Sequence, residues 1–225
     1  MNHYLQIFIL ILQIIGLYFF SRLTINEIFY FFRIFIKDEK TIAILVALLF
    51  FPGTIFHEMA HYFFALIMML NVREIKLIPE FDNHQLKLGK VLYEKKDFVR
   101  GIIVGLAPII FALVFFWWLA KFSLFPNKNL FLNIFFIYII FVVSSTMFSS
   151  RQDLIDLIYI IPLFIILIGL IYIFDIKIQL IFQNQGLIEK IINSVSKINF
   201  FLLLALLINL FLIIFLRTFR KIIKK

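Results

Sequence analysis

Long apolar runs alternate with short polar segments along most of this chain. A helix needs about 20 apolar residues to cross the hydrocarbon core of a bilayer. Runs that approach this length span residues 4–20, 41–70, 102–120, 130–149, 154–174 and 199–216. Little sequence remains between them. The pattern predicts an all-α, polytopic membrane protein with about six transmembrane helices.

Two further stretches place polar residues along one face of a helix. In TINEIFYFFRIFIK, residues 24–37, the polar positions Asn26, Tyr30 and Arg33 recur at helical spacing. GLIEKIINSVSKI, residues 186–198, repeats the pattern before the last apolar run. A helix with one polar and one apolar face is typical of the membrane–water interface. We therefore predict an interfacial helix in each stretch.

The only sizeable polar segment, residues 71–101, carries a different periodicity. REIKLIP (73–79) and HQLKLGKVLYEK (84–95) alternate polar and apolar residues over short distances, with Pro79 and Gly89 as punctuation. Such alternation favours short β-strands over helix. The segment predicts a small membrane-associated β-hairpin or sheet, whose exposed edges need either a cover or a strand-shaped partner.

Composition supports a membrane protein and bears on its orientation. The chain is 64% hydrophobic with a mean hydropathy of +1.06, whereas soluble domains are about 45–50% apolar. Basic loops facing the cytoplasm explain the net charge of +9 without a nucleic-acid partner. With both termini in the cytoplasm, more than half of the Lys and Arg residues lie on that side. We predict this orientation in a prokaryotic plasma membrane, in part because cysteine is absent.

Ionisable residues inside the second apolar run need a physical reason, since each costs several kcal/mol in hydrocarbon. FPGTIFHEMAHYFFALI, residues 51–67, contains the pattern H-E-x-x-H at His57, Glu58 and His61. Residues four apart share a helix face, so both histidines can bind one zinc ion. Glu58 can then take a proton from the attacking water and pass it to the leaving amine. A polar cluster that only packs helices together is the structural alternative.

A catalytic zinc ion usually has three protein ligands and one open position. Cysteine is absent, so the third ligand is a histidine or a carboxylate. We expect His3, at the terminus, and His84, in the polar segment, to face solvent. SSTMFSSRQDLID, residues 144–156, offers Asp153 and Asp156 between two apolar runs. Periodicity does not separate them, and Asp153 is also suited to cap the following helix.

These features together resemble the site-2 protease family of intramembrane zinc metalloproteases. The likeness rests on PGTIFHEMAHYFFA (52–65), GLAP (105–108), SSRQD (149–153) and the strand-like segment 71–101. It implies one zinc ion held by His57, His61 and Asp153, with Glu58 as the acid/base, in a compact form without a PDZ domain. Asp156 is an alternative ligand. Leu154 follows Asp153 where the family has glycine. Nearby polar residues that could contact substrate or the oxyanion are Ser149, Ser150, Gln152 and Arg151.

The predicted organisation has three parts. Residues 1–40 form the first transmembrane helix and an interfacial helix, residues 41–156 the metalloprotease core, and residues 157–225 the C-terminal helices with their basic tail. The predicted function is hydrolysis of peptide bonds in or near transmembrane segments of other membrane proteins. A membrane metal transporter and a non-catalytic relative that binds membrane helices are the alternatives. Oligomeric state stays open.

Overall fold

The computed structural model describes residues 3–76, 80–82, 85–87, 90–94, 97–148 and 185–223. Within these ranges, four helices are long and apolar enough to cross a membrane. They are α1 (His3–Phe35), α2 (Glu39–Ile67), α3 (Phe98–Lys121) and α8 (Gln185–Ile223). A shorter apolar helix, α4 (Leu130–Thr146), follows α3. The prediction of a mostly helical membrane protein is confirmed, whereas the predicted span 154–174 lies outside the described residues.

Both predicted interfacial segments are continuous with a membrane-spanning helix. Residues 24–35 form the second half of α1, and residues 186–198 form the start of α8. Neither proline nor glycine interrupts the chain between each segment and its neighbouring apolar run. At about 1.5 Å per residue, α1 and α8 each exceed the roughly 30 Å hydrocarbon thickness of a bilayer. Each pair of predicted elements is therefore one long helix.

Asp and Asn side chains begin three of these helices. Asp38 accepts a hydrogen bond from the N–H of Thr41 at 2.9 Å and starts α2. Asp97 and Asn129 start α3 and α4 in the same way. A short side-chain acceptor at this position satisfies N–H groups that lack a helical partner. The Thr41 hydroxyl, and then its N–H, also hold the pKa of the Asp38 carboxyl below its ordinary value.

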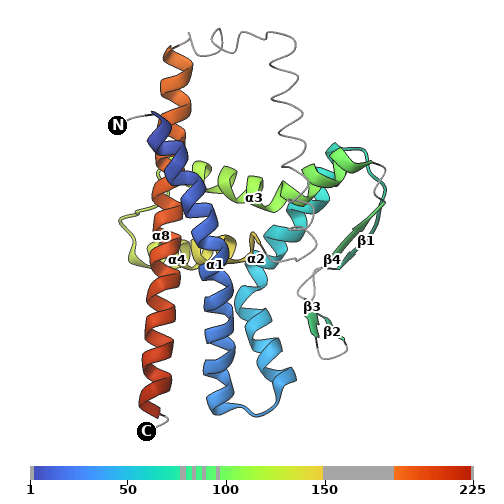
Figure 1. Ribbon diagram of the computed structural model, residues 1–225, viewed down its shortest axis with the longest axis vertical. Coiled ribbons are helices and arrows are strands. Elements are labelled where there is room, and N and C mark those ends of the chain that lie inside the picture. Colours follow the sequence, from blue (N-terminus) through green and yellow to red (C-terminus); the bar gives the residue numbers. More distant parts are fainter. Residues whose placement is uncertain are drawn as a thin grey trace.

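The first and last helices pack side by side and run in the same direction (Figure 1). Asn199, near the start of α8, donates to Gln6 near the start of α1 at 2.8 Å. Arg217, near the end of α8, donates to Glu27 of α1, also at 2.8 Å. The two termini therefore lie at opposite ends of this pair. The prediction of two cytoplasmic termini is therefore not supported, because parallel helices that each cross the bilayer end on opposite sides.

The parallel packing of α1 and α8 also affects the orientation predicted from the distribution of Lys and Arg residues. Six alternating spans would make the first and last helices antiparallel. In addition, α2 runs back along α1 after a three-residue connection, so segment 71–101 begins at the end of α2 away from that connection, on the side of the molecule away from α8. Arg217, Arg220 and Lys221 belong to the opposite end, near the end of α8. The basic residues of segment 71–101 and those at the end of α8, which the prediction placed together on the cytoplasmic side, thus lie at different ends of the molecule. The count of Lys and Arg residues therefore no longer favours one orientation.

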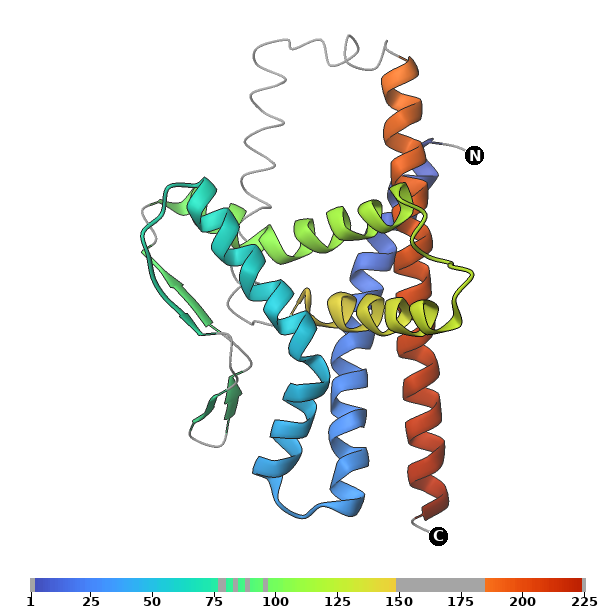
Figure 2. The same ribbon diagram turned by 180° about the vertical axis from the view of Figure 1, so that it is seen from behind.

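Helices α3 and α4 lie across the α1–α8 pair (Figure 2). One buried cluster joins Leu17 of α1, Phe116 of α3, Ile140 of α4 and Phe201 of α8. A second cluster joins α1, α2, α4 and α8 around Phe50. The second half of α4, from Ile140 to Thr146, is therefore buried among its neighbours, whereas its first half is largely exposed.

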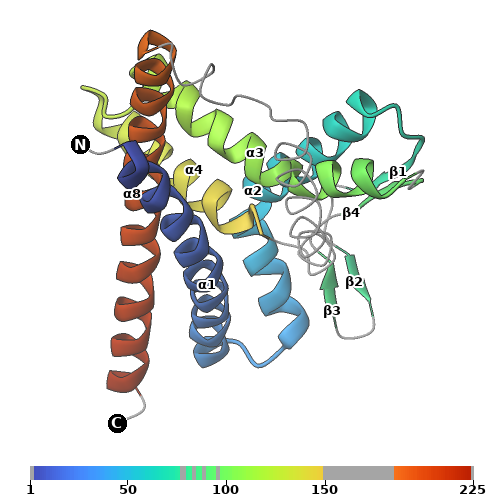
Figure 3. The ribbon, with the colours of Figure 1, turned by 45° about the horizontal axis from the view of Figure 1, so that its top comes forward.

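The polar segment forms two antiparallel ladders on the side of the molecule away from α8 (Figure 3). In the first, β1 (Val72–Lys76) pairs with β4 (Lys90–Tyr93), and in the second, β2 (Glu80–Asp82) pairs with β3 (Gln85–Lys87). The predicted strands are confirmed. The first ladder packs on the end of α2, where Val72 and Tyr93 contact a cluster that includes Ala65 and Val104.

Candidate metal centre

The HExxH residues lie in the second half of α2, where the helix passes between α3 and α4. His57, Glu58 and His61 are 3%, 6% and 6% exposed, so all three are buried. The helix changes direction along its length (Figure 2), and Pro52 lies inside it one turn before His57. A proline removes a helical hydrogen bond and bends the helix. The bend therefore precedes the two histidines.

The two histidines face one another through the same ring atom. His61 Nε2 lies 3.1 Å from His57 Nε2, and the ring centroids are 4.7 Å apart. Zinc–nitrogen bonds of about 2.0–2.1 Å place two ligand atoms of a tetrahedral site roughly 3.3 Å apart. The spacing of the two nitrogens therefore fits a shared zinc ion with little movement of either ring. This confirms the predicted common face of the two histidines.

The other nitrogen of His61 has a partner of its own. His61 Nδ1 lies 2.9 Å from the backbone carbonyl of Val104 in α3. A carbonyl only accepts hydrogen bonds, so Nδ1 carries the proton. In the neutral ring Nε2 then presents a lone pair, which can accept a hydrogen bond from His57 or bind a metal ion. Metal-binding histidines usually donate their second N–H to a carbonyl or carboxylate in this way.

A second helix approaches α2 closely, one turn before His57. A Cβ placed on Gly53 would lie 2.6 Å from both the Val142 carbonyl oxygen and Thr146 Oγ1 of α4. The end of α4 is buried as far as Phe148, which is 7% exposed. Phe148 therefore lies in the interior of the bundle, and Thr146 lies close to the motif helix.

The predicted third ligand falls beyond this point. Asp153 and Asp156 lie outside the described residues, as do Ser149, Ser150 and Gln152. Among the residues that the structure describes, no three His, Cys, Asp or Glu side chains form a group that could hold a metal ion. His3 starts α1, on another helix, and His84 also lies outside the described residues. The described part of the site supplies two facing histidine nitrogens and the buried Glu58.

Sequence reasoning did not identify Val104, because its contribution is a backbone carbonyl that no side-chain pattern reveals. The sequence contained one indirect indication of this carbonyl, the proline of GLAP, which lies four residues after Val104. Comparison of the chain with protein-family models, with curated proteins and with solved structures finds no match. The argument for function therefore rests on the chemistry of these residues.

Proposed function

We propose that this protein is an intramembrane zinc metalloendopeptidase that cuts transmembrane segments of other membrane proteins. The observation that carries the proposal is the pair of buried histidines with facing Nε2 atoms, 3.1 Å apart, beside a buried glutamate. Zinc prefers nitrogen and carboxylate ligands of this kind. Glu58 directly follows His57 and is 6% exposed, and helix packing alone does not require the cost of a buried carboxylate.

The residues divide the chemistry between them. When bound, zinc polarises a peptide carbonyl and lowers the pKa of a coordinated water to about 7. His57 and His61 hold the ion through Nε2, and the Val104 carbonyl orients the ring of His61. Glu58 takes a proton from the attacking water and returns it to the leaving amine. Burial of all three side chains keeps bulk water away from these transfers.

Asp153 is the proposed third ligand, with Asp156 as the alternative. The buried end of α4 supports this choice, because the chain leaves Phe148 inside the bundle and reaches Asp153 five residues later. Irregular backbone at this depth is allowed where protein or a water-filled cavity surrounds it. Ser149, Ser150 and Gln152 are polar enough for such a setting, and we propose them as substrate or oxyanion contacts.

The substrate would bind as an extended strand. A peptide bond in a helix is shielded by the helical hydrogen bonds, so a transmembrane substrate must unwind locally before water can attack. Each described strand of segment 71–101 pairs with one described neighbour, which leaves an edge available for strand addition. The β1–β4 ladder packs beside Val104, the residue that contacts His61. We further propose a prokaryotic plasma membrane as its location.

Metal analysis of the detergent-purified protein tests this site. We expect about one zinc ion per chain in the wild type, lost in His57→Ala and Asp153→Ala. Zinc should be retained in Asp156→Ala and in the control His3→Ala, which removes a histidine from another helix. Elemental analysis by mass spectrometry gives the count. If the wild-type protein binds no zinc after zinc is supplied, the metalloprotease proposal is rejected. If zinc is lost in Asp156→Ala and retained in Asp153→Ala, Asp156 is the third ligand in place of Asp153.

A further inference from the structure

The carbonyl that holds His61 is available because of a proline. In an α-helix, the N–H of each residue donates to the carbonyl four residues earlier. For Val104 that donor would belong to residue 108, which is Pro108 and has no N–H. Its ring also pushes against the same carbonyl and opens the helix there. The Val104 oxygen therefore lacks its normal helical donor and can accept from outside α3.

The N–H of His61 and the carbonyl of Val104 are hydrogen-bond partners in a buried environment. Val104 is 0% exposed and His61 is 6% exposed, so neither group can rely on bulk water. A buried carbonyl without a donor costs free energy comparable to a lost hydrogen bond. Gly101, Val104, Gly105 and Pro108 recur at helical spacing on one face of α3, and all are buried. Small residues on this face let the two helix backbones approach closely.

We propose that Pro108 is a positioning residue for the metal site, acting through the Val104 carbonyl to orient His61. This inference rests on the zinc site of the proposed function. It predicts that any residue with an N–H at position 108 will compete with His61 for the carbonyl. The ring of His61 would then lose the hydrogen bond that directs Nε2 towards His57. Loss of such a partner typically lowers metal affinity by about 10- to 100-fold.

The test compares Pro108→Ala with Ile109→Ala in the full-length, detergent-purified chain. Pro108→Ala restores a helical hydrogen bond, so resistance to unfolding should be unchanged or higher, while zinc affinity falls about tenfold or more. Pro108→Gly restores the same N–H and should lose affinity similarly. Ile109→Ala removes a side chain that packs on the core, so it should lower stability and keep zinc affinity. Competition with a zinc chelator and thermal circular dichroism measure the two quantities.

The results separate this inference from the proposed function. If the wild type binds zinc and Pro108→Ala binds it equally well, the positioning role is rejected while the zinc site stands. Equal losses of affinity in Pro108→Ala and Ile109→Ala would show a general loosening of α3 and also reject the role. A wild type without zinc affinity would reject the site itself. Nitrogen NMR of labelled histidine then still reports whether His61 Nδ1 carries the proton.

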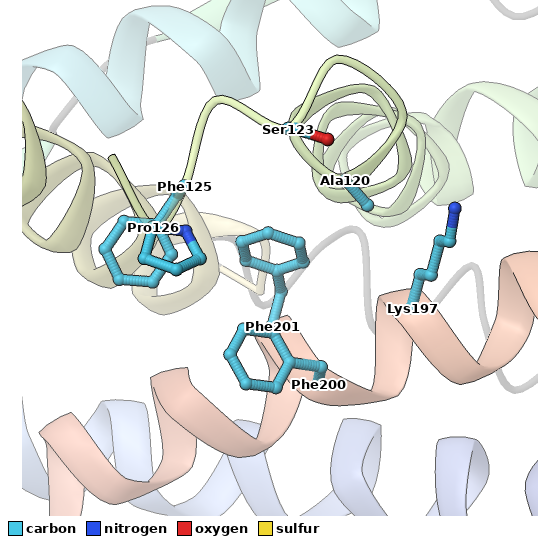
Figure 4. A pocket seen from close by; sticks show the side chains of 7 residues that line it. All are labelled: Ala120, Ser123, Phe125, Pro126, Lys197, Phe200 and Phe201. Carbon is cyan, nitrogen blue, oxygen red and sulfur yellow. The ribbon is translucent and has the colours of Figure 1, made fainter. Parts of the chain in front are cut away.

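A second surface, away from the histidines, has the character of a lipid site. An open pocket of about 250 Å³ lies between the end of α3, the connection to α4 and the side of α8. Figure 4 shows Lys197 rising from α8 beside Ala120 and Ser123, with the rings of Phe125, Phe200 and Phe201 grouped away from it. The pocket thus combines an aromatic wall with a cation at its edge.

The position of this pocket corresponds to a membrane–water boundary. Lys197 directly precedes the apolar run 199–216 of α8, and α3 ends at Lys121. Trp117 Nε1 donates to Ser194 Oγ of α8 at 3.3 Å, and Lys121 Nζ lies 4.8 Å from the Trp117 ring centroid. Tryptophan and lysine together are typical of the interface on both sides of the hydrocarbon core.

The positive charges of Lys121 and Lys197 at this boundary have few acidic residues near them in α3, α4 and α8. Residues 98–148 contain no Asp or Glu, and residues 185–223 contain Glu189 alone. Within the described residues no carboxylate forms an ion pair with Lys197 or Lys121. Within the described residues, Lys197 and Lys121 are therefore available to an anion, and the anion that a bilayer surface offers is the phosphate of a lipid.

We infer that this pocket binds the headgroup of an anionic phospholipid, with its phosphate beside Lys197 and its upper acyl chain against the phenylalanine rings. Of the two tryptophans of the chain, Trp117 donates to Ser194 of α8 at this boundary and reports on it. Bromine atoms on acyl chains quench tryptophan fluorescence at short range. The protein is reconstituted into vesicles that contain brominated phosphatidylglycerol or brominated phosphatidylcholine at equal mole fraction.

We expect phosphatidylglycerol to quench the wild type more strongly, with a preference of about fivefold in relative affinity. Lys197→Ala should remove this preference, and Lys197→Arg should keep it. Lys190→Ala, an equal loss of charge two helical turns away on the same helix, should also keep it. Equal quenching by the two lipids, a preference that survives Lys197→Ala, or equal losses in Lys190→Ala and Lys197→Ala would each overturn the proposal.

Discussion

Glu58→Gln is expected to abolish peptide-bond cleavage while leaving the zinc content at the wild-type level. Glutamine has nearly the same size and shape as glutamate but cannot take up a proton at neutral pH. Because Glu58 is the proposed acid/base, its loss should lower the cleavage rate by about 10²- to 10⁴-fold. The side chain is buried beside His57, and neither histidine is altered.

The measurement uses purified protein and a panel of single-span transmembrane peptides in detergent, with products identified by mass spectrometry. Glu189→Gln is the matched control, because it makes the same chemical change on the exposed face of α8 and should keep wild-type activity. Cleavage that persists in Glu58→Gln would reject the proposed mechanism. Zinc binding without cleavage of any peptide by the wild type would instead favour the non-catalytic, helix-binding alternative.

Gly53→Ala is expected to destabilise the protein by about 1–3 kcal/mol, the usual cost of overpacking. The added Cβ would lie 2.6 Å from the Val142 carbonyl oxygen and 2.9 Å from its carbon. Both are backbone atoms of α4, so relief requires movement of the whole helix rather than of a side chain. Because Gly53 precedes His57 by one helical turn, the same movement should also weaken zinc binding.

Gly16→Ala provides the control within the same chain. Its added Cβ would meet Leu206 Cδ2 at 3.3 Å, the flexible end of a side chain that can move aside. Alanine also favours helix over glycine by about 1 kcal/mol. This variant should therefore be neutral or slightly stabilising. Denaturant unfolding followed by circular dichroism compares the two, and equal stabilities for both variants would contradict the close contact between α2 and α4.

The sequence predicted the pairing of His57 and His61 on one helix face because the relevant signal is local. Residues four apart share a helix face whatever surrounds the helix, so His57 and His61 could be paired from their spacing alone. The third ligand cannot be predicted from local spacing in this way. Asp153 and Asp156 are far from the motif in sequence, and spacing does not say which of them approaches it. That choice stays a prediction.

The predicted orientation is not supported by the fold, and it came from counting charges rather than contacts. The Lys and Arg count assumes that successive apolar runs simply alternate across the membrane. The contacts of Asn199 with Gln6 and of Arg217 with Glu27 show instead that α1 and α8 are parallel. These partners are about 190 residues apart, so no local pattern could pair them.

By itself the sequence determined the helical, membrane-spanning character of the chain, its short strands and the HExxH pair. Each depends on neighbouring residues and on the periodicity of helix or strand. Only the tertiary structure decided the direction of α8, the contact of Gly53 with α4 and the hydrogen bond from His61 to Val104. Those features depend on backbone atoms and on residues distant in the chain, which meet only when the helices pack.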